Sequence, residues 1–171
     1  MEFLIVEDNS FILRELKEEV MKIMKRNDPS FSVERCVSAQ SYNDARRFID
    51  GKSYDVILLD HRMPVENAVE LEKDYLEYNK RLRNIGYSLI PMIRARERST
   101  ADISTAIIGT SSFSDAAIRE DLGPQYGTQP LGIGLYEPNF KINKSGDLKD
   151  LEQALHVIWP VYQFDKILRN K

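Results

Sequence analysis

Residues 54–64 read Tyr-Asp-Val-Ile-Leu-Leu-Asp-His-Arg-Met-Pro, and they decide the predicted fold. Residues 56–59 form a short, unbroken apolar run that begins with a β-branched side chain. Such a run is typical of a strand that is buried on both faces, as in a parallel sheet. Asp60 follows at the carboxyl end of that strand, where open α/β sheets place ligands and chemistry. Met63 and Pro64 then turn the backbone away from the strand.

A second apolar run of the same kind lies at the start of the chain. Residues 3–6 read Phe-Leu-Ile-Val and are followed at once by Glu7 and Asp8. The carboxyl ends of parallel strands meet at one edge of a sheet, so we expect Glu7, Asp8 and Asp60 to lie together there. Three carboxylates that close repel one another, and either a bound proton or a cation such as Mg²⁺ would relieve the repulsion. The plainer alternative is three solvated acids at strand ends, which any α/β protein can have.

The composition limits the range of functions. The chain has 171 residues, of which 42% are hydrophobic and 30% are charged, as expected for one soluble domain spanning residues 1–171. A net charge of −3 gives no basic surface for nucleic acid. The single cysteine, Cys36, excludes an internal disulfide and suits a reducing cytoplasm. The sequence starts without a basic leader, and no apolar run approaches the ~18 residues of a membrane span, so we expect neither secretion nor a membrane partner.

The remaining hydrophobic pattern predicts alternating strands and helices. Helices are expected after the first strand, over residues 41–51, and near the end of the chain, where Pro160 should break or kink the last helix. Further strands are expected at 31–37, 106–109 and 131–136. The predicted fold class is therefore α/β, with a doubly wound, five-stranded parallel sheet.

Residues 65–85, called the insertion below, interrupt this alternation as a helical segment after the third strand. Apolar residues recur there in steps of four and three, which is a heptad-like seam made by Leu71, Tyr75, Tyr78, Leu82 and Ile85. The opposite face is strongly charged, so the seam needs a surface to cover it. One interpretation is a helical hairpin with the following helix, through Leu89 and Ile93. The other is a homodimer that pairs through the insertion.

Three motifs stand at the ends of predicted strands: Leu-Ile-Val-Glu-Asp-Asn at 4–9, Asp-Val-Ile-Leu-Leu-Asp-His-Arg-Met-Pro at 55–64, and Ile-Ile-Gly-Thr-Ser at 107–111. Together they resemble a response-regulator receiver domain, the CheY-like domain of two-component signalling. The resemblance covers nearly the whole chain except the insertion. It implies a flavodoxin-like sheet with the strand order 2-1-3-4-5.

The resemblance also implies a role for each motif residue. Asp60 would be the phosphoacceptor for a histidine kinase or a phosphotransfer protein. Glu7, Asp8, the Asp60 carboxylate and the backbone carbonyl of Arg62 would hold Mg²⁺, which is needed because the attacking carboxylate and the phosphate are both anionic. Thr110 would be the switch residue whose hydroxyl binds the phosphate oxygens. Alternatively, Thr110 could merely cap the next helix.

The chain departs from the family pattern at the end of the predicted fifth strand. The family has a lysine just before the proline that ends this strand, and this chain has Glu137 before its proline. A carboxylate at that position would repel a phosphate, so Glu137 would have to turn away, bind a cation or prevent phosphorylation. Lys141 or Lys144 could substitute for the family's lysine from the following loop. The aromatic switch residue of the family, three positions before the lysine, falls on Gly134, with Tyr136 nearby.

Two functions from different classes remain open on this basis. The first is a stand-alone receiver, a phosphorelay protein that acts through contacts with a downstream protein. Its enzymatic activity would be limited to phosphoryl acceptance and slow autodephosphorylation. The second is a pseudo-receiver, a protein-interaction module that works without phosphorylation, which Glu137 favours. A Mg²⁺-dependent phosphatase is disfavoured, because Arg62 stands where such enzymes have a second aspartate.

Overall fold

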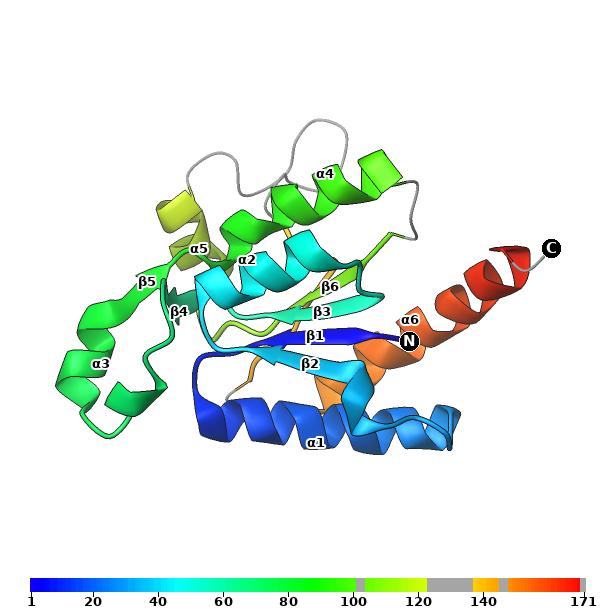
Figure 1. Cartoon of the computed structure of the whole chain (residues 1–171), viewed down its shortest axis with the longest axis horizontal. Coiled ribbons are helices and arrows are strands. Elements are labelled where there is room, and N and C mark those ends of the chain that lie inside the picture. Colours follow the sequence, from blue (N-terminus) through cyan, green and yellow to red (C-terminus); the bar gives the residue numbers. More distant parts are fainter. Residues whose placement is uncertain (101–103, 123–136, 145–147, 170–171) are drawn as a thin grey trace.

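The computed structural model describes residues 1–100, 104–122, 137–144 and 148–169, and a five-stranded parallel sheet lies at its centre (Figure 1). The strand order is β2-β1-β3-β6-β7, so the predicted α/β fold with a flavodoxin-like order is confirmed. The strands are β1 (Phe3–Val6), β2 (Cys36–Ala39), β3 (Val56–Leu59), β6 (Ala106–Gly109) and β7 (Phe140–Lys141).

The fifth strand of this sheet comes later in the chain than the hydrophobic pattern suggested. The predicted strand at 131–136 lies outside the described residues, and β7 occupies the fifth position. In the register of β6 and β7, Ile108 faces Phe140 and Gly109 faces Lys141. The amide of Ile142 extends this pairing by donating to the carbonyl of Gly109 at 2.8 Å. The chain therefore leaves the edge of the sheet just after Ile142.

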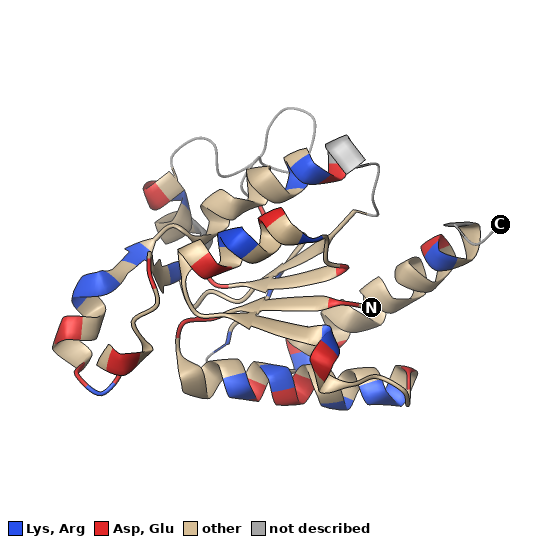
Figure 2. Cartoon of the chain, in the orientation of Figure 1, with Lys and Arg blue, Asp and Glu red and all other residues tan. Residues whose placement is uncertain are grey.

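Helices cover both faces of the sheet (Figure 1). One face carries α1 (Ser10–Asn27) and α6 (Lys149–Arg169), and the other carries α2 (Tyr42–Gly51), α4 (Ile90–Thr100) and α5 (Asp115–Leu122). Charged residues lie along the length of α1 (Figure 2). The helix α6 continues through Pro160, so of the predicted break or kink at that residue the break is wrong. Within the described residues, no helix combines the length and the apolar character that crossing a membrane requires.

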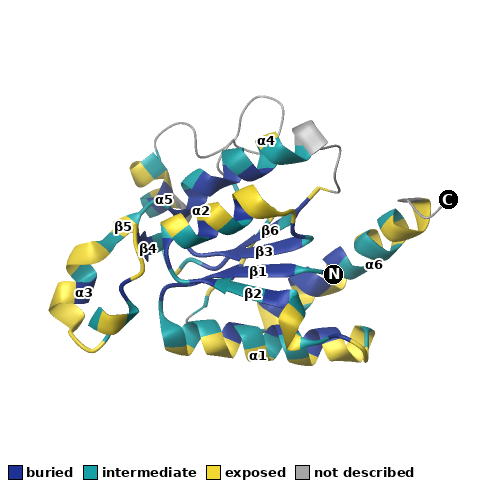
Figure 3. Cartoon of the chain, in the orientation of Figure 1, coloured by how far each residue is buried: buried dark blue, intermediate teal, exposed yellow. Residues whose placement is uncertain are grey.

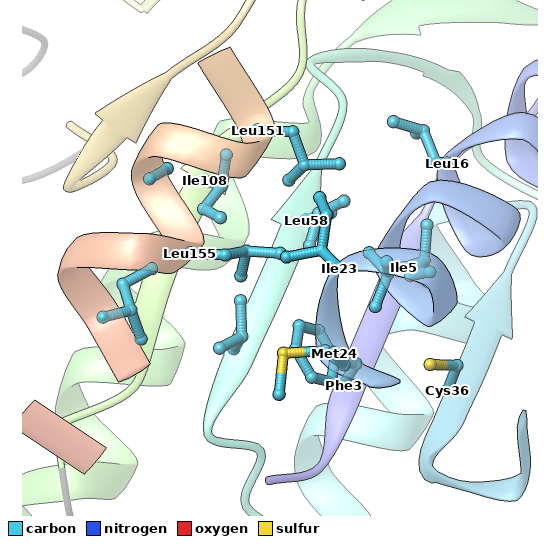
Figure 4. Close-up of a cluster of buried hydrophobic side chains, with 14 of the residues drawn as sticks. Phe3, Ile5, Leu16, Ile23, Met24, Cys36, Leu58, Ile108, Leu151 and Leu155 are labelled. Carbon is cyan, nitrogen blue, oxygen red and sulfur yellow. The ribbon is translucent and has the colours of Figure 1, made fainter. Parts of the chain in front are cut away.

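The hydrophobic core has two halves, because successive side chains of a strand point to opposite faces. Phe3 and Ile5 of β1 pack with α1 and α6, and Figure 4 shows them beside Leu16, Ile23, Leu151 and Leu155. Leu4 and Val6 pack on the other side with side chains from α2, α4 and α5, namely Ile49, Ile90, Ile93 and Ile118. The strands β1 and β3 are buried along their whole length (Figure 3). Burial on both faces explains the continuous apolar runs in the sequence.

The insertion, predicted as a helical segment, stands on a small antiparallel sheet that follows β3. Its base is β4 (Arg62–Pro64) paired with β5 (Leu82–Asn84). Between these strands lie a short 3-10 helix, η2 (Val69–Leu71), and the helix α3 (Tyr75–Arg81), which bears charges of both signs (Figure 2). A second 3-10 helix, η3 (Gly86–Leu89), then leads into α4. The predicted helical hairpin is therefore wrong, because the seam residues are divided among η2, α3 and β5.

Candidate functional site

Three acidic side chains meet at the carboxyl edge of the sheet. The register of β1 and β3 pairs Val6 with Leu59, so Glu7 and Asp60 leave the sheet at the same level. The Asp60 amide donates to the carbonyl of Val6 at 3.0 Å and extends the ladder by one step. Carboxylate oxygens of Glu7, Asp8 and Asp60 all lie within 4.8 Å of one another, and all three residues are buried. The alternative of three solvated acids is therefore wrong.

The start of α1 holds the loop that carries two of these acids. Asn9 caps the helix, and its side-chain oxygen accepts hydrogen bonds from the amides of Phe11 at 3.0 Å and Ile12 at 3.1 Å. The Asn9 amide donates to Glu7 Oε1 at 3.2 Å. An N-cap of this kind stabilises a helix by about 1 kcal/mol. Asp8 therefore sits between the end of a buried strand and a capped helix, which restricts its backbone.

Lys144 supplies the positive charge of the site. Its Nζ lies 2.5 Å from Asp60 Oδ2 and 2.8 Å from Glu7 Oε2. Glu137, which the sequence aligned with the lysine of the family, instead forms an ion pair with Lys141 at 3.3 Å. Within the described residues it is thus Lys144, and not Glu137 at the expected lysine position, that brings a charged side chain to Asp60. The sequence placed this charge too early because β7 ends at Lys141, five residues after the predicted end of the strand at residue 136 and three residues before Lys144.

Burial and mutual repulsion shift the proton affinities of these groups. Burial and the neighbouring Asp60 raise the pKa of Glu7 from its ordinary value of 4.5 to about 8. Burial also raises the pKa of Asp60, against the attraction of Lys144. For Lys144, burial lowers the pKa, but the carboxylates of Asp60 and Glu7 outweigh it and the net direction is upward. The ammonium group therefore stays charged at neutral pH, whereas Glu7 tends to hold a proton there as long as no further cation is bound.

This cluster fits a hard divalent cation. Three buried carboxylates carry more negative charge than the single ammonium group of Lys144 balances. Mg²⁺ prefers oxygen ligands and commonly binds through one or two carboxylates together with water. Arg62, whose backbone carbonyl is the fourth expected ligand, lines a pocket of about 420 Å³ that also contains the three acids. The residues present therefore suit Mg²⁺ in number, charge and ligand type.

Thr110 lies beside Asp60 at the end of the next strand. The register pairs Leu59 with Gly109, and the Thr110 amide donates to the carbonyl of Leu59 at 3.0 Å. Thr110 is fully buried, and its hydroxyl has no hydrogen-bond partner in the described part of the chain. His61 points away from the acids, with its Nε2 at 3.5 Å from an Asp121 carboxylate oxygen. Thr110 thus offers an unpaired hydroxyl at the level of Asp60.

Tyr78 of the insertion is a site residue that the sequence analysis did not identify. Its hydroxyl lies 2.5 Å from Asp8 Oδ2, in a buried position. In the sequence, Tyr78 falls in the apolar seam of the insertion, and its spacing carries no sign of a polar partner. Because its ring is apolar, a tyrosine fits an apolar position of a helical pattern even when its hydroxyl binds a carboxylate. Tyr75, one turn earlier in α3, lines the same pocket but is 76% exposed.

Solved structures with the same fold include several receiver domains. A response regulator receiver domain from Methylobacillus flagellatus is 19% identical, with a TM-score of 0.54 over 92% of this chain and 98% of that chain. A receiver protein from Pseudomonas putida is 21% identical, with a TM-score of 0.52 over 90% of this chain and 93% of that one. The response regulator TrrA from Thermotoga maritima, solved with Mg²⁺ and BeF, is 16% identical, with a TM-score of 0.53 over 92% and 99% of the two chains. No protein-family model and no curated protein matches the chain. At these identities the comparison establishes a receiver-like fold.

Proposed function

We propose that this protein is a receiver domain of two-component signalling, which accepts a phosphoryl group on Asp60 with Mg²⁺ and signals through contacts with another protein. The observation that carries the proposal is the contact of Lys144 with Asp60 inside a buried cluster of three acids. A nucleophilic carboxylate, an acidic metal site and a cation for the incoming phosphate are the parts that this chemistry needs. They meet at the carboxyl edge of a parallel sheet, the usual place for a site in this fold.

Each side chain has a distinct task in this reaction. Asp60 would attack the phosphorus of a phosphohistidine on a kinase or phosphotransfer protein, so that a P–O bond forms as the P–N bond breaks and the imidazole leaves. Mg²⁺ held by Glu7, Asp8, Asp60 and the carbonyl of Arg62 would supply neutralisation of the negative charge on both reactants. Lys144 would pair with a phosphoryl oxygen. Thr110 would donate its hydroxyl to another, and the unpaired, buried state of that hydroxyl supports this role.

The coupling of phosphorylation to the protein surface would differ from the family pattern. With Lys144 as the lysine, the position three residues before it is Lys141, which is not aromatic. Gly134 and Tyr136, considered from the sequence, lie outside the described residues. The proposal therefore includes no switch in which a threonine moves together with an aromatic ring. The downstream partner would instead respond to structural changes close to Asp60, including changes in the insertion.

The proposal includes a cytoplasmic location. Cys36, the only cysteine, is buried as a free thiol, which suits a reducing compartment.

A direct test is incubation with acetyl phosphate and Mg²⁺, followed by measurement of the intact mass. The expected result is one added phosphoryl group, absent from Asp60→Ala and absent when EDTA removes the metal. A wild-type protein that gains no mass contradicts the proposal. Labelling that persists in Asp60→Ala contradicts the choice of Asp60 as the acceptor.

A pseudo-receiver that binds a partner without phosphorylation is the second candidate. Glu137 no longer favours it, because Glu137 pairs with Lys141. The observation that now favours it is the contact of Tyr78 with Asp8, since the insertion covers part of the acidic site. The same mass measurement separates the two candidates. A pseudo-receiver stays unlabelled with acetyl phosphate and with a phosphorylated histidine donor alike.

A further inference from the structure

Two side chains that donate hydrogen bonds to the three acids come from separate parts of the chain. Lys144, after the last strand, contacts Glu7 and Asp60. Tyr78, from the insertion, donates to Asp8 Oδ2 at 2.5 Å across 70 residues of sequence. An O–H···O⁻ hydrogen bond of this length is charge-assisted and stronger than one between neutral groups. A residue of the insertion therefore donates a hydrogen bond to a site whose acidic residues follow strands of the central sheet.

Contacts away from the phenol keep the insertion against the site. Glu72 Oε1 accepts hydrogen bonds from the amide and the hydroxyl of Ser10, at 2.9 Å and 2.8 Å. Arg62 Nη2 donates to Asn79 Oδ1 at 3.1 Å, next to Tyr78 in the chain. The pairing of β4 with β5 closes the base of the insertion. Because these contacts do not involve the phenol, Tyr78 keeps its place when only its hydroxyl is removed.

We infer that Tyr78 is a positioning residue of the Mg²⁺ site, which fixes the Asp8 carboxylate through Oδ2 and leaves Oδ1 to bind the cation. This inference rests on the proposed function, because the metal site is part of it. Hydrogen-bond donors to metal-binding side chains set the orientation and basicity of the ligand, and their loss typically weakens metal binding about 10–100-fold.

A phenol suits this position better than a cationic donor. A lysine or arginine at the same place would repel Mg²⁺, whereas a neutral hydroxyl orders the carboxylate without adding charge. A phenol ordinarily keeps its proton at physiological pH, so its hydroxyl is a donor to the carboxylate. Lys144 already supplies the one cation that the phosphate needs.

The chain contains a matched control for this inference. Tyr75 lies one turn earlier in α3 and lines the same pocket, but its side chain is 76% exposed. Tyr75→Phe and Tyr78→Phe remove the same atom from the same helix, and both keep the ring that packs. Calorimetric titration of each variant with Mg²⁺ compares their affinities without any phosphorylation. Amide NMR spectra of α3 report whether the insertion keeps its fold.

We expect Tyr78→Phe to weaken Mg²⁺ binding about 10–100-fold, and Tyr75→Phe to change it less than about twofold. The amide resonances of α3 should stay in place in both variants. Mg²⁺ binding that is unchanged or tighter in Tyr78→Phe overturns the positioning role while leaving the metal site intact. A weakened affinity together with loss of the α3 resonances also overturns it, because the effect is then structural. Failure of the wild type to bind Mg²⁺ overturns the metal site itself, and with it the proposed function.

Discussion

Lys144 Nζ lies 2.5 Å from Asp60 Oδ2, so a residue after the last strand of the sheet neutralises an acid at the end of the central strand. The same ammonium group lies 2.8 Å from Glu7 Oε2 and thereby bridges two carboxylates. Removal of this bridge leaves two buried acids that repel each other, which costs more than the loss of an exposed ion pair. Lys144 is thus important both for the stability of the site and for its affinity for a phosphate.

The first prediction concerns the charge of Lys144. Lys144→Gln should lower the rate of labelling by acetyl phosphate about 10–100-fold, because one donor to the developing negative charge is lost. Lys141→Gln removes the same charge from a residue that pairs with Glu137, and it should change the rate less than about twofold. Glu137→Lys should have an equally small effect. Intact mass measured over time provides all four rates, and equal rates for Lys144→Gln and wild type would exclude Lys144 from the reaction.

The second prediction concerns the pH dependence of stability without metal. The pKa of Glu7 is about 8 in the folded protein, above its ordinary value of 4.5. Between these two values the folded state holds a proton that the unfolded state has released, so the free energy of unfolding should fall as the pH rises. At about 1.4 kcal/mol per pKa unit, the fall attributable to Glu7 should be on the order of 5 kcal/mol over the whole window and complete near the folded pKa.

Urea unfolding in EDTA, at about pH 5 and about pH 8, measures this difference. Glu7→Gln cannot ionise and should show a smaller decrease than wild type. Added Mg²⁺ should restore stability to the wild type at the higher pH, because the cation replaces the proton. A wild-type protein whose stability rises across this window would show that Glu7 is ionised throughout.

The sequence predicted the centre of the sheet and failed at its edge. Residues 3–6 and 56–59 are buried on both faces, and such strands must be apolar throughout. Their pattern therefore located Glu7, Asp8 and Asp60 correctly at one edge. The edge strand β7 has only two residues, Phe140 and Lys141, and one of them is exposed, so it leaves no periodic signal. The longer apolar run at 131–136 therefore predicts the fifth strand instead. This assignment places the lysine position of the family at Glu137.

The insertion shows a second limit of prediction from hydrophobic periodicity. Its heptad-like spacing indicated one long amphipathic seam, but the chain turns at β5, so Leu82 belongs to a strand and Tyr78 to a helix. Periodicity reports which residues share a helical face and does not report what that face contacts. Tyr78 was expected to pack on apolar side chains, and it donates to Asp8 instead. Such a contact joins residues 70 positions apart in the sequence and has no local signature.

The third prediction concerns the oligomeric state. Dimerisation through the insertion requires a continuous apolar face. The apolar residues of the insertion lie in different elements, α3 and β5, and do not form one. Tyr75 and Leu76 remain exposed, at 76% and 71%, whereas Tyr78 is buried against the acidic site. The double variant Tyr75→Asp/Leu76→Asp should therefore have the same molar mass as wild type in light scattering. A dimeric wild type that becomes a folded monomer in this variant would instead establish the insertion as a dimer interface.

The last prediction concerns the glycine that lets the insertion return to the sheet. A Cβ atom on Gly86 would lie 1.9 Å from the backbone oxygen of Asp60 and 2.7 Å from Met63 Cε. The Gly86 amide also donates to the carbonyl of His61 at 2.8 Å, so the two segments cannot easily separate. Gly86→Ala should therefore lower the free energy of unfolding by about 3 kcal/mol and slow labelling of Asp60, because it displaces the acceptor backbone.

Gly51→Ala is the matched control for this variant. Gly51 ends α2, and a Cβ atom there would meet nothing within 4 Å. The substitution should raise the free energy of unfolding by about 0.5–1 kcal/mol, since alanine reduces the freedom of the unfolded chain, and it should leave labelling unchanged. Urea unfolding and intact mass measure both effects. Equal stability of Gly86→Ala and wild type would show that the backbone of Asp60 can move aside, and the close approach of the insertion would then not constrain the acceptor.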